Sequence, residues 1–76
     1  MNVSLDHDVA VDLIRYKLRR VQELITSIMD RWNVIDAGDF LQKAKEGAYP
    51  EAENDAIDLK QLLHEEKKLK NLLQDL

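Results

Sequence analysis

Apolar residues recur in the first part of the chain at alternating intervals of three and four positions. The series consists of Val11, Ile14, Leu18, Val21, Ile25, Ile28 and Trp32. This spacing places its members along one stripe of a single α-helix, and such a stripe must pack against another helix. Because glycine and proline are absent before Gly38, the pattern predicts one unbroken helix over residues 5–32. We expect Ser4 or Asp6 to cap it, since either side chain accepts a hydrogen bond from a first-turn amide.

A second apolar stripe follows Pro50. Its members are Ala52, Ala56, Leu59, Leu63, Leu69, Leu73 and Leu76. Proline suits the first turn of a helix, because the N–H that it lacks would have no intrahelical partner there. The pattern therefore predicts a second long helix over residues 50–74, which pairs with the first in antiparallel orientation.

Two polar residues, Glu66 and Lys70, interrupt the second stripe where leucine would be expected. A polar residue inside an apolar stripe lowers stability but disfavours slipped pairings. We therefore expect Glu66 to fix the register of the two long helices, with Lys17 or Arg19 within its reach.

The segment between the two stripes carries a short pattern of its own. A capping aspartate is followed three positions later by a second aspartate, then by an apolar pair and a closing glycine: Asp36, Asp39, Phe40, Leu41 and Gly47. This arrangement predicts a short capped helix over residues 37–46 that ends at a glycine. Phe40 and Leu41 are expected to fold over Trp32 and to close that end of the hairpin.

The fold class is therefore all-α, with residues 1–76 forming a single domain: an antiparallel helical hairpin with a short connecting helix. Further leucines widen the apolar arc of each long helix beyond what one partner helix covers. Together with Trp32, they form the predicted interface: Leu13, Leu24, Trp32, Leu62, Leu69, Leu72 and Leu76. Contiguous exposed apolar surface marks an interface, so we expect dimerisation into a four-helix bundle. The alternative is a monomer whose middle helix covers these leucines.

Charged residues lie beside the flanking leucines. Cations share the flank of the first helix and anions the flank of the last, and the residues concerned are Lys17, Arg20, Arg31, Glu51, Asp55 and Asp58. We hypothesise that these cations pair with these anions, within or between chains, and so set partner choice and orientation. The alternative is that each charge is independently solvated, since exposed pairs contribute little.

Composition narrows the partners that the chain can bind. The net charge is −4, and residues 36–76 hold ten acids against six lysines. This balance argues against general nucleic-acid binding, which needs a cationic face, although the basic run at residues 15–20 is a candidate phosphate contact. The chain contains no cysteine and no apolar run long enough to span a membrane, so we expect a cytoplasmic protein that does not enter membranes.

The acids at the start of the last helix are the densest cluster of carboxylates. Glu51, Asp55 and Asp58 have a spacing that aims them along one helix face, which could hold Mg²⁺. The stretch 53–59, followed by Leu62 and Leu63, resembles the second acidic motif of the MazG-type all-α nucleotide pyrophosphatases. The resemblance implies a magnesium-dependent nucleotide hydrolase. The alternative is that these acids complement the helix dipole.

That pyrophosphatase family also carries paired glutamates on a preceding helix, where this chain offers Glu23 and Asp30. A second resemblance lies in the first helix: Leu18, Arg19, Ile25, Ile28, Asp30 and Arg31 are similar to the first helix of all-α chorismate mutases. It implies a helical dimer whose arginines bind a dicarboxylate.

Catalytic sets are otherwise missing from the sequence. His7 and His64 lack metal-ligand spacing, and antiparallel pairing places His7 beside residues 73–76. We therefore expect a small non-enzymatic interaction protein, a regulator or adaptor without a cofactor, that associates with itself and binds a partner protein. The alternatives are the magnesium-dependent hydrolase, and a nucleic-acid-associated regulator or antitoxin-like inhibitor.

Overall fold

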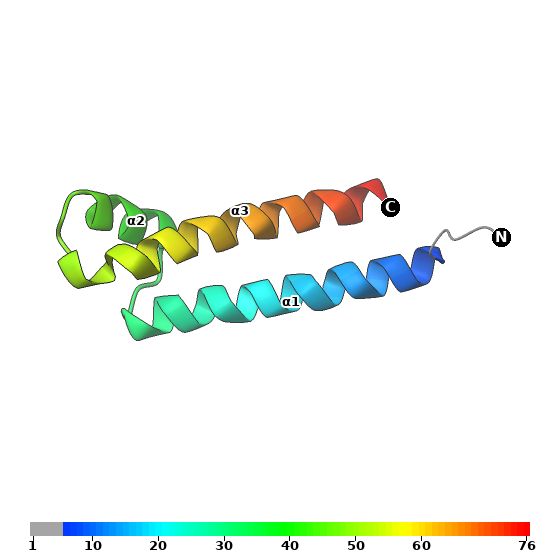
Figure 1. Ribbon diagram of the computed structural model, residues 1–76, viewed down its shortest axis with the longest axis horizontal. Helices are drawn as coiled ribbons and strands as arrows, with labels where there is room; N and C mark the ends of the chain where they lie inside the picture. Colours follow the sequence, from blue (N-terminus) through cyan, green and yellow to red (C-terminus); the bar gives the residue numbers. More distant parts are fainter. Residues whose placement is uncertain (1–5) are drawn as a thin grey trace.

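The computed structural model describes residues 6–76. They form a helical hairpin with a short helix in the connection between the two long helices. Its elements are α1 (His7–Arg31), α2 (Ala37–Lys45), the 3₁₀ turn η1 (Pro50–Ala52) and α3 (Glu53–Asp75). Figure 1 shows α1 and α3 running antiparallel along each other, with α2 beside the end of the hairpin where α1 stops. The prediction of an all-helical fold is confirmed.

The side chain of Asp6 fixes the start of α1, and the backbone conformation of Asn33 fixes its end. The Asp6 carboxylate accepts a hydrogen bond of 2.9 Å from the Asp8 N–H and caps the N-terminus, while Ser4 lies outside the described residues. After α1, Asn33 adopts a positive φ of 53°, and the next N–H, that of Val34, donates to the Met29 carbonyl. Asparagine tolerates this left-handed conformation, so it ends α1 in the way that glycine ends many helices.

The short helix α2 has the predicted cap at each end. The Asp36 side chain accepts a hydrogen bond of 3.1 Å from the Asp39 N–H. Past the other end, Gly47 takes a φ of 82°, where an L side chain would be strained, and its N–H donates to the Ala44 carbonyl. Because both ends are satisfied locally, nine residues hold a helix that would be too short to be stable alone.

The final helix starts one turn later than its predicted bounds of 50–74. Pro50 opens the 3₁₀ turn η1, in which the Ala52 N–H donates to the Tyr49 carbonyl over 3.0 Å. Tight 3₁₀ turns of this kind often begin helices. Regular α-helix follows from Glu53 to Asp75.

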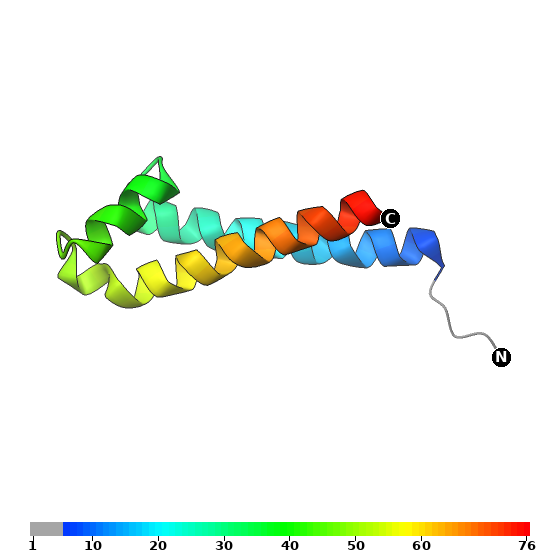
Figure 2. The same ribbon diagram turned by 90° about the horizontal axis from the view of Figure 1, so that it is seen from above.

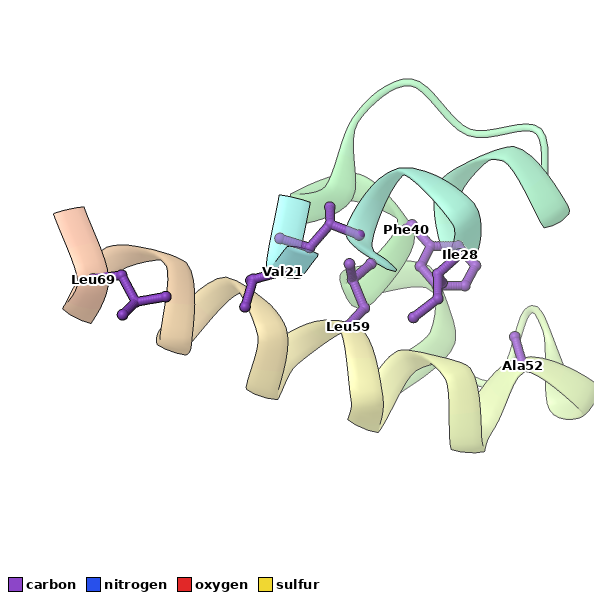
Figure 3. Packing of buried hydrophobic residues seen from close by; sticks show 7 residues of the cluster. Val21, Ile28, Phe40, Ala52, Leu59 and Leu69 are labelled. Carbon is purple, nitrogen blue, oxygen red and sulfur yellow. The ribbon is translucent and has the colours of Figure 1, made fainter. Parts of the chain in front are cut away.

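The core gathers at the end of the hairpin that α2 covers. Its members are Val21, Ile25, Ile28, Phe40, Ala52, Leu59 and Leu69. Phe40 is 1% exposed and Leu59 is 0% exposed. Figure 3 shows Phe40 and Ile28 close together, with Leu69 standing well away from them along α3. The buried surface is therefore concentrated at one end of an elongated molecule.

Three aromatic rings complete this end. The Trp32 ring lies 6.1 Å from Phe40 and 6.4 Å from Tyr49, measured between centroids, and Phe40 stacks on Tyr49 at 5.7 Å. The expectation that Phe40 folds over Trp32 is confirmed, and Leu41 packs against the same core. We call this region the closed end.

At the opposite end, α1 and α3 run on with no third helix among residues 6–76 (Figure 2). The His7 ring nitrogen Nε2 lies 2.7 Å from the Leu76 carbonyl oxygen, which confirms the expected position of His7 beside the end of the last helix. We call this region the open end. It is a two-helix layer, whereas the closed end has three helices.

Candidate protein interface

Each long helix carries a second line of residues beside its core stripe, again spaced by three and four positions. On α1 the line is Leu13, Lys17, Arg20, Leu24, Ser27 and Arg31. On α3 it is Asp55, Asp58, Leu62, Glu65, Leu69, Leu72 and Leu76. Such spacing keeps each line on one side of its helix. We call the two lines together the lateral face.

Two ion pairs bring these lines next to each other. The Lys17 ammonium lies 3.2 Å from Glu65 Oε1, and the Arg31 guanidinium lies 2.8 Å from Asp55 Oδ2. Between these pairs runs a groove lined by residues of α1 and α3 alone: Leu24, Ser27, Ile28, Arg31, Asp55, Asp58, Gln61, Leu62 and Glu65. A separate groove lies between α2 and α3. The lateral face is therefore on a side of the hairpin that α2 leaves open.

Four of the predicted interface leucines are substantially exposed. The exposed fractions are 56% for Leu13, 43% for Leu24, 42% for Leu72 and 48% for Leu76. Leu62 is half-buried as a wall of the groove. Leu69 differs from the others, because at 4% exposure it belongs to the core of its own chain and offers no free surface.

Trp32, also predicted for the interface, is half-buried and anchored within its own chain. Its indole N–H donates to Asp55 Oδ2 over 2.8 Å, and the Arg31 guanidinium donates to the same oxygen over 2.8 Å. The hydrogen bond from Trp32, followed by that from Arg31, holds the pKa of Asp55 below its ordinary value. The Trp32–Asp55 bond was not predicted from the sequence, although a partly buried indole N–H usually needs an acceptor.

The charged residues predicted to pair are only partly brought together within the chain. Arg31 reaches Asp55, but Lys17 reaches Glu65, and Arg20 pairs at 2.8 Å with Glu23 on its own helix. Among residues 6–76, neither Glu51 nor Asp58 forms an ion pair. Pairing between chains stays a prediction.

Glu66 finds a partner other than the two that its position suggested. The Gln22 amide donates to Glu66 Oε2 over 3.2 Å, and the Lys70 ammonium lies 3.8 Å away on the same helix. Lys17 is bound to Glu65 instead. The Glu66 carboxylate, which interrupts the apolar stripe, therefore accepts a hydrogen bond from the facing helix.

The acidic cluster does not assemble into a cation site. In the described part of the chain, no three carboxylate or imidazole side chains converge closely enough to hold a metal ion. Glu51 lies in η1, outside the regular α-helix that carries Asp55 and Asp58, and Asp55 is already bound by Trp32 and Arg31. Across residues 6–76, no helix has the length and apolar character required to cross a bilayer.

Comparison with known proteins places the chain in a family. Searches of curated proteins and of solved structures found no match. The model of the Uncharacterized protein MJ0235 family matches residues 9–76, which includes the whole hairpin apart from its first capping residues. The chain therefore belongs to the Uncharacterized protein MJ0235 family.

Proposed function

We propose that this chain is a small non-enzymatic interaction protein that associates with itself through the lateral face to form an antiparallel four-helix bundle. The observation that carries the proposal is the exposure of Leu13, Leu24 and Leu72 on the lateral face, where Leu24 also lines the groove between α1 and α3. Leucines that gather on one side of a small domain are typical of an interface.

The energetics of the open end support self-association. A domain of this size has a marginal core of its own, and the chain contains no cysteine with which to form a disulfide. Burying a leucine side chain completely contributes about 1.5–3 kcal/mol. A second hairpin on the lateral face would bury several leucines at once, and so stabilise the region where the chain itself provides the fewest buried side chains.

A partner protein is the second part of the proposal. The groove between α2 and α3 is lined by small and apolar residues, including Gly38, Leu41, Ala44 and Ala56, with Ile57 at its edge 51% exposed. This groove lies away from the lateral face and stays free in the proposed bundle. We propose it as the surface that a partner protein contacts, which would make the chain an adaptor or regulator.

Light scattering across a concentration series tests the self-association. The proposal predicts a mass that rises to twice the 8.8 kDa of the chain. Leu24→Asp, which buries a charge in the centre of the lateral face, should hold the mass at that of one chain. Ile57→Asp is the matched control, because it is similarly exposed but lies in the other groove, and it should still dimerise. A wild-type mass of one chain at every concentration would refute the proposal.

A further inference from the structure

We infer that the two-fold axis of the bundle runs parallel to its helices, so that each α1 packs on α3 of the partner subunit and not on the partner's α1. The inference rests on the proposed self-association, and it adds the orientation of the second copy and the residues that specify it.

The register within one chain follows from four contacts between α1 and α3. They join His7 to Leu76, Lys17 to Glu65, Gln22 to Glu66 and Arg31 to Asp55. In each contact the two residue numbers add up to between 82 and 88, with a mean near 85. Residues of the lateral face whose numbers add up to about 85 therefore stand at nearly the same height: Leu13 with Leu72, Arg20 with Glu65, and Leu24 with Leu62.

The charges of the lateral face are divided by sign between its two helices. All three charged residues that α1 contributes to the lateral face are cations, and all three that α3 contributes are anions: Lys17, Arg20, Arg31, Asp55, Asp58 and Glu65. Two hairpins can pack these faces together with two-fold symmetry in two ways. An axis across the helices sets α1 on the partner's α1 and aligns like charges, which costs free energy. An axis parallel to the helices sets each line of cations on a line of anions.

The register within one chain and the two-fold symmetry together determine which residues meet across the interface. Rotation about an axis parallel to the helices leaves the height of every residue unchanged. Each residue of α1 therefore meets the residue of the partner's α3 that stands level with it in its own chain. Leu13 then contacts the partner's Leu72, and Leu24 contacts the partner's Leu62, which gives two leucine layers.

Between these layers, Arg20 meets the partner's Glu65. In the single chain Arg20 binds Glu23 on its own helix, where its side chain is 54% exposed, so it can turn to a second carboxylate without leaving a buried charge. The Glu65 side chain is 33% exposed and holds Lys17 through Oε1. This ionic layer interrupts the leucines of the lateral face on α1, and it sets the orientation of the two hairpins relative to each other.

Cysteine cross-linking tests the orientation, because the chain has no cysteine of its own. Leu13→Cys and Leu72→Cys are prepared as separate chains, one of them labelled with ¹⁵N, and are mixed and oxidised. The inference predicts a disulfide between unlike chains, identified by mass. Tyr16→Cys, which is exposed outside the lateral face, replaces Leu13→Cys as the control and should not cross-link to Leu72→Cys.

Dimers in which Leu13→Cys and Leu72→Cys do not cross-link, or in which two Leu13→Cys chains do, would overturn the orientation while leaving self-association intact. A monomeric mass for both variants and for wild type would overturn the self-association as well.

Charge reversal provides a second test that does not depend on disulfide geometry. Arg20→Glu and Glu65→Arg should each weaken the homodimer about tenfold or more, because each sets two like charges together in every dimer. Mixing the two variants should give a heterodimer in which both contacts again join opposite charges, one of them being the native Arg20–Glu65 contact and the other the same contact with its charges reversed. The double variant Arg20→Glu/Glu65→Arg should recover the wild-type dissociation constant. A double variant no tighter than the single variants would contradict the inference.

Discussion

The closed and open ends of this hairpin are built from the same two helices, yet they differ in how completely they bury their leucines. At the closed end, α2 and the aromatic rings seal the layer, and Phe40, Ala52 and Leu59 lose essentially all contact with solvent. Towards the open end Leu69 is buried, while Leu72 and Leu76 remain nearly half exposed. The difference shows that two helices bury the residues between them but leave the flanking leucines exposed where α2 does not cover them.

A second copy should stabilise the two ends of the hairpin to different extents. The core of the closed end has its third layer from within the chain and therefore gains little from a second copy, although the groove of the lateral face runs beside it on the side away from α2. Within residues 6–76, each long helix at the open end has only the other as a neighbour, and the lateral face continues along it to Leu13 and Leu76. We therefore expect variants at the closed end to change the folding of each chain, and variants on the lateral face to change association.

The largest effect is expected from Phe40→Ala at the closed end. Phe40 is fully buried between Trp32 and Tyr49, so removing its ring leaves a cavity and should cost about 3–5 kcal/mol. Urea unfolding monitored by circular dichroism measures the loss. Tyr16→Ala, at an exposed position of α1, is the control and should change the free energy of unfolding by less than about 0.5 kcal/mol. Equal effects of the two variants would remove the distinction between core and surface.

Leu24→Ala should have the next largest effect, and it should appear in association. Each dimer would lose two leucine side chains from its interface, so the dissociation constant should rise at least about tenfold. Sedimentation equilibrium measures this constant. Ile57→Ala removes a side chain of similar exposure from the other groove and should leave the constant unchanged. If both variants weakened the dimer equally, the interface would not be the lateral face.

Gly47→Ala tests the cap that holds α2 in place. The open space around Gly47 admits a methyl group, but its φ of 82° strains any L residue, at a cost of about 1–2 kcal/mol. Thermal unfolding should therefore show a lower midpoint. Glu46→Ala, one residue earlier in an ordinary helical conformation, should leave the midpoint nearly unchanged. An unchanged midpoint for Gly47→Ala would mean that this cap does not limit the stability of the closed end.

The smallest effect is expected from Trp32→Phe, and it should depend on pH. The pKa of Asp55 in the folded chain lies below its ordinary value of 3.8, chiefly because of the Trp32 hydrogen bond. The resulting stabilisation is present above pH 3.8 and is lost as the pH falls through the lowered pKa. Trp32→Phe keeps an aromatic ring but removes this bond.

Urea unfolding over a pH series should therefore show the stability difference between wild type and Trp32→Phe shrinking as the pH falls through this range. Tyr49→Phe retains the ring and leaves the Asp55 contacts intact, so it should follow the wild-type profile. Wild-type and Trp32→Phe curves that stay parallel throughout would show that the bond does not couple Asp55 to folding.

Much of this architecture could be read from the sequence because its signals are local. The three-and-four spacing, the capping aspartates Asp6 and Asp36, and Gly47 each act within one or two turns of a helix. The end of α1 was predicted at residue 32 and lies at Arg31, although Asn33 takes the place of the more familiar glycine. The 3₁₀ turn before α3 was missed because Pro50 is equally suited to open either type of helix.

Features of the lateral face depended on contacts between helices, and these were harder to predict. Leu69 belongs to both the apolar stripe and the flanking line of α3, and the packing of α1 against α3 buries it in the core. From the sequence, Lys17 could pair with any of several acids along α3, and the antiparallel register places Glu65 next to it. Trp32 was predicted to lie at the closed end, but its hydrogen bond to Asp55 depends on where α3 starts relative to the end of α1.

Hydrogen exchange measured residue by residue, in wild type and in Leu24→Asp, tests most directly whether a second copy completes the open end. The account predicts that amides around Leu59 keep their protection in the variant, whereas amides around Leu69 and Leu72 lose theirs as the dimer is lost. Equal protection of the open end in both proteins, with wild type sedimenting as a single chain, would contradict it.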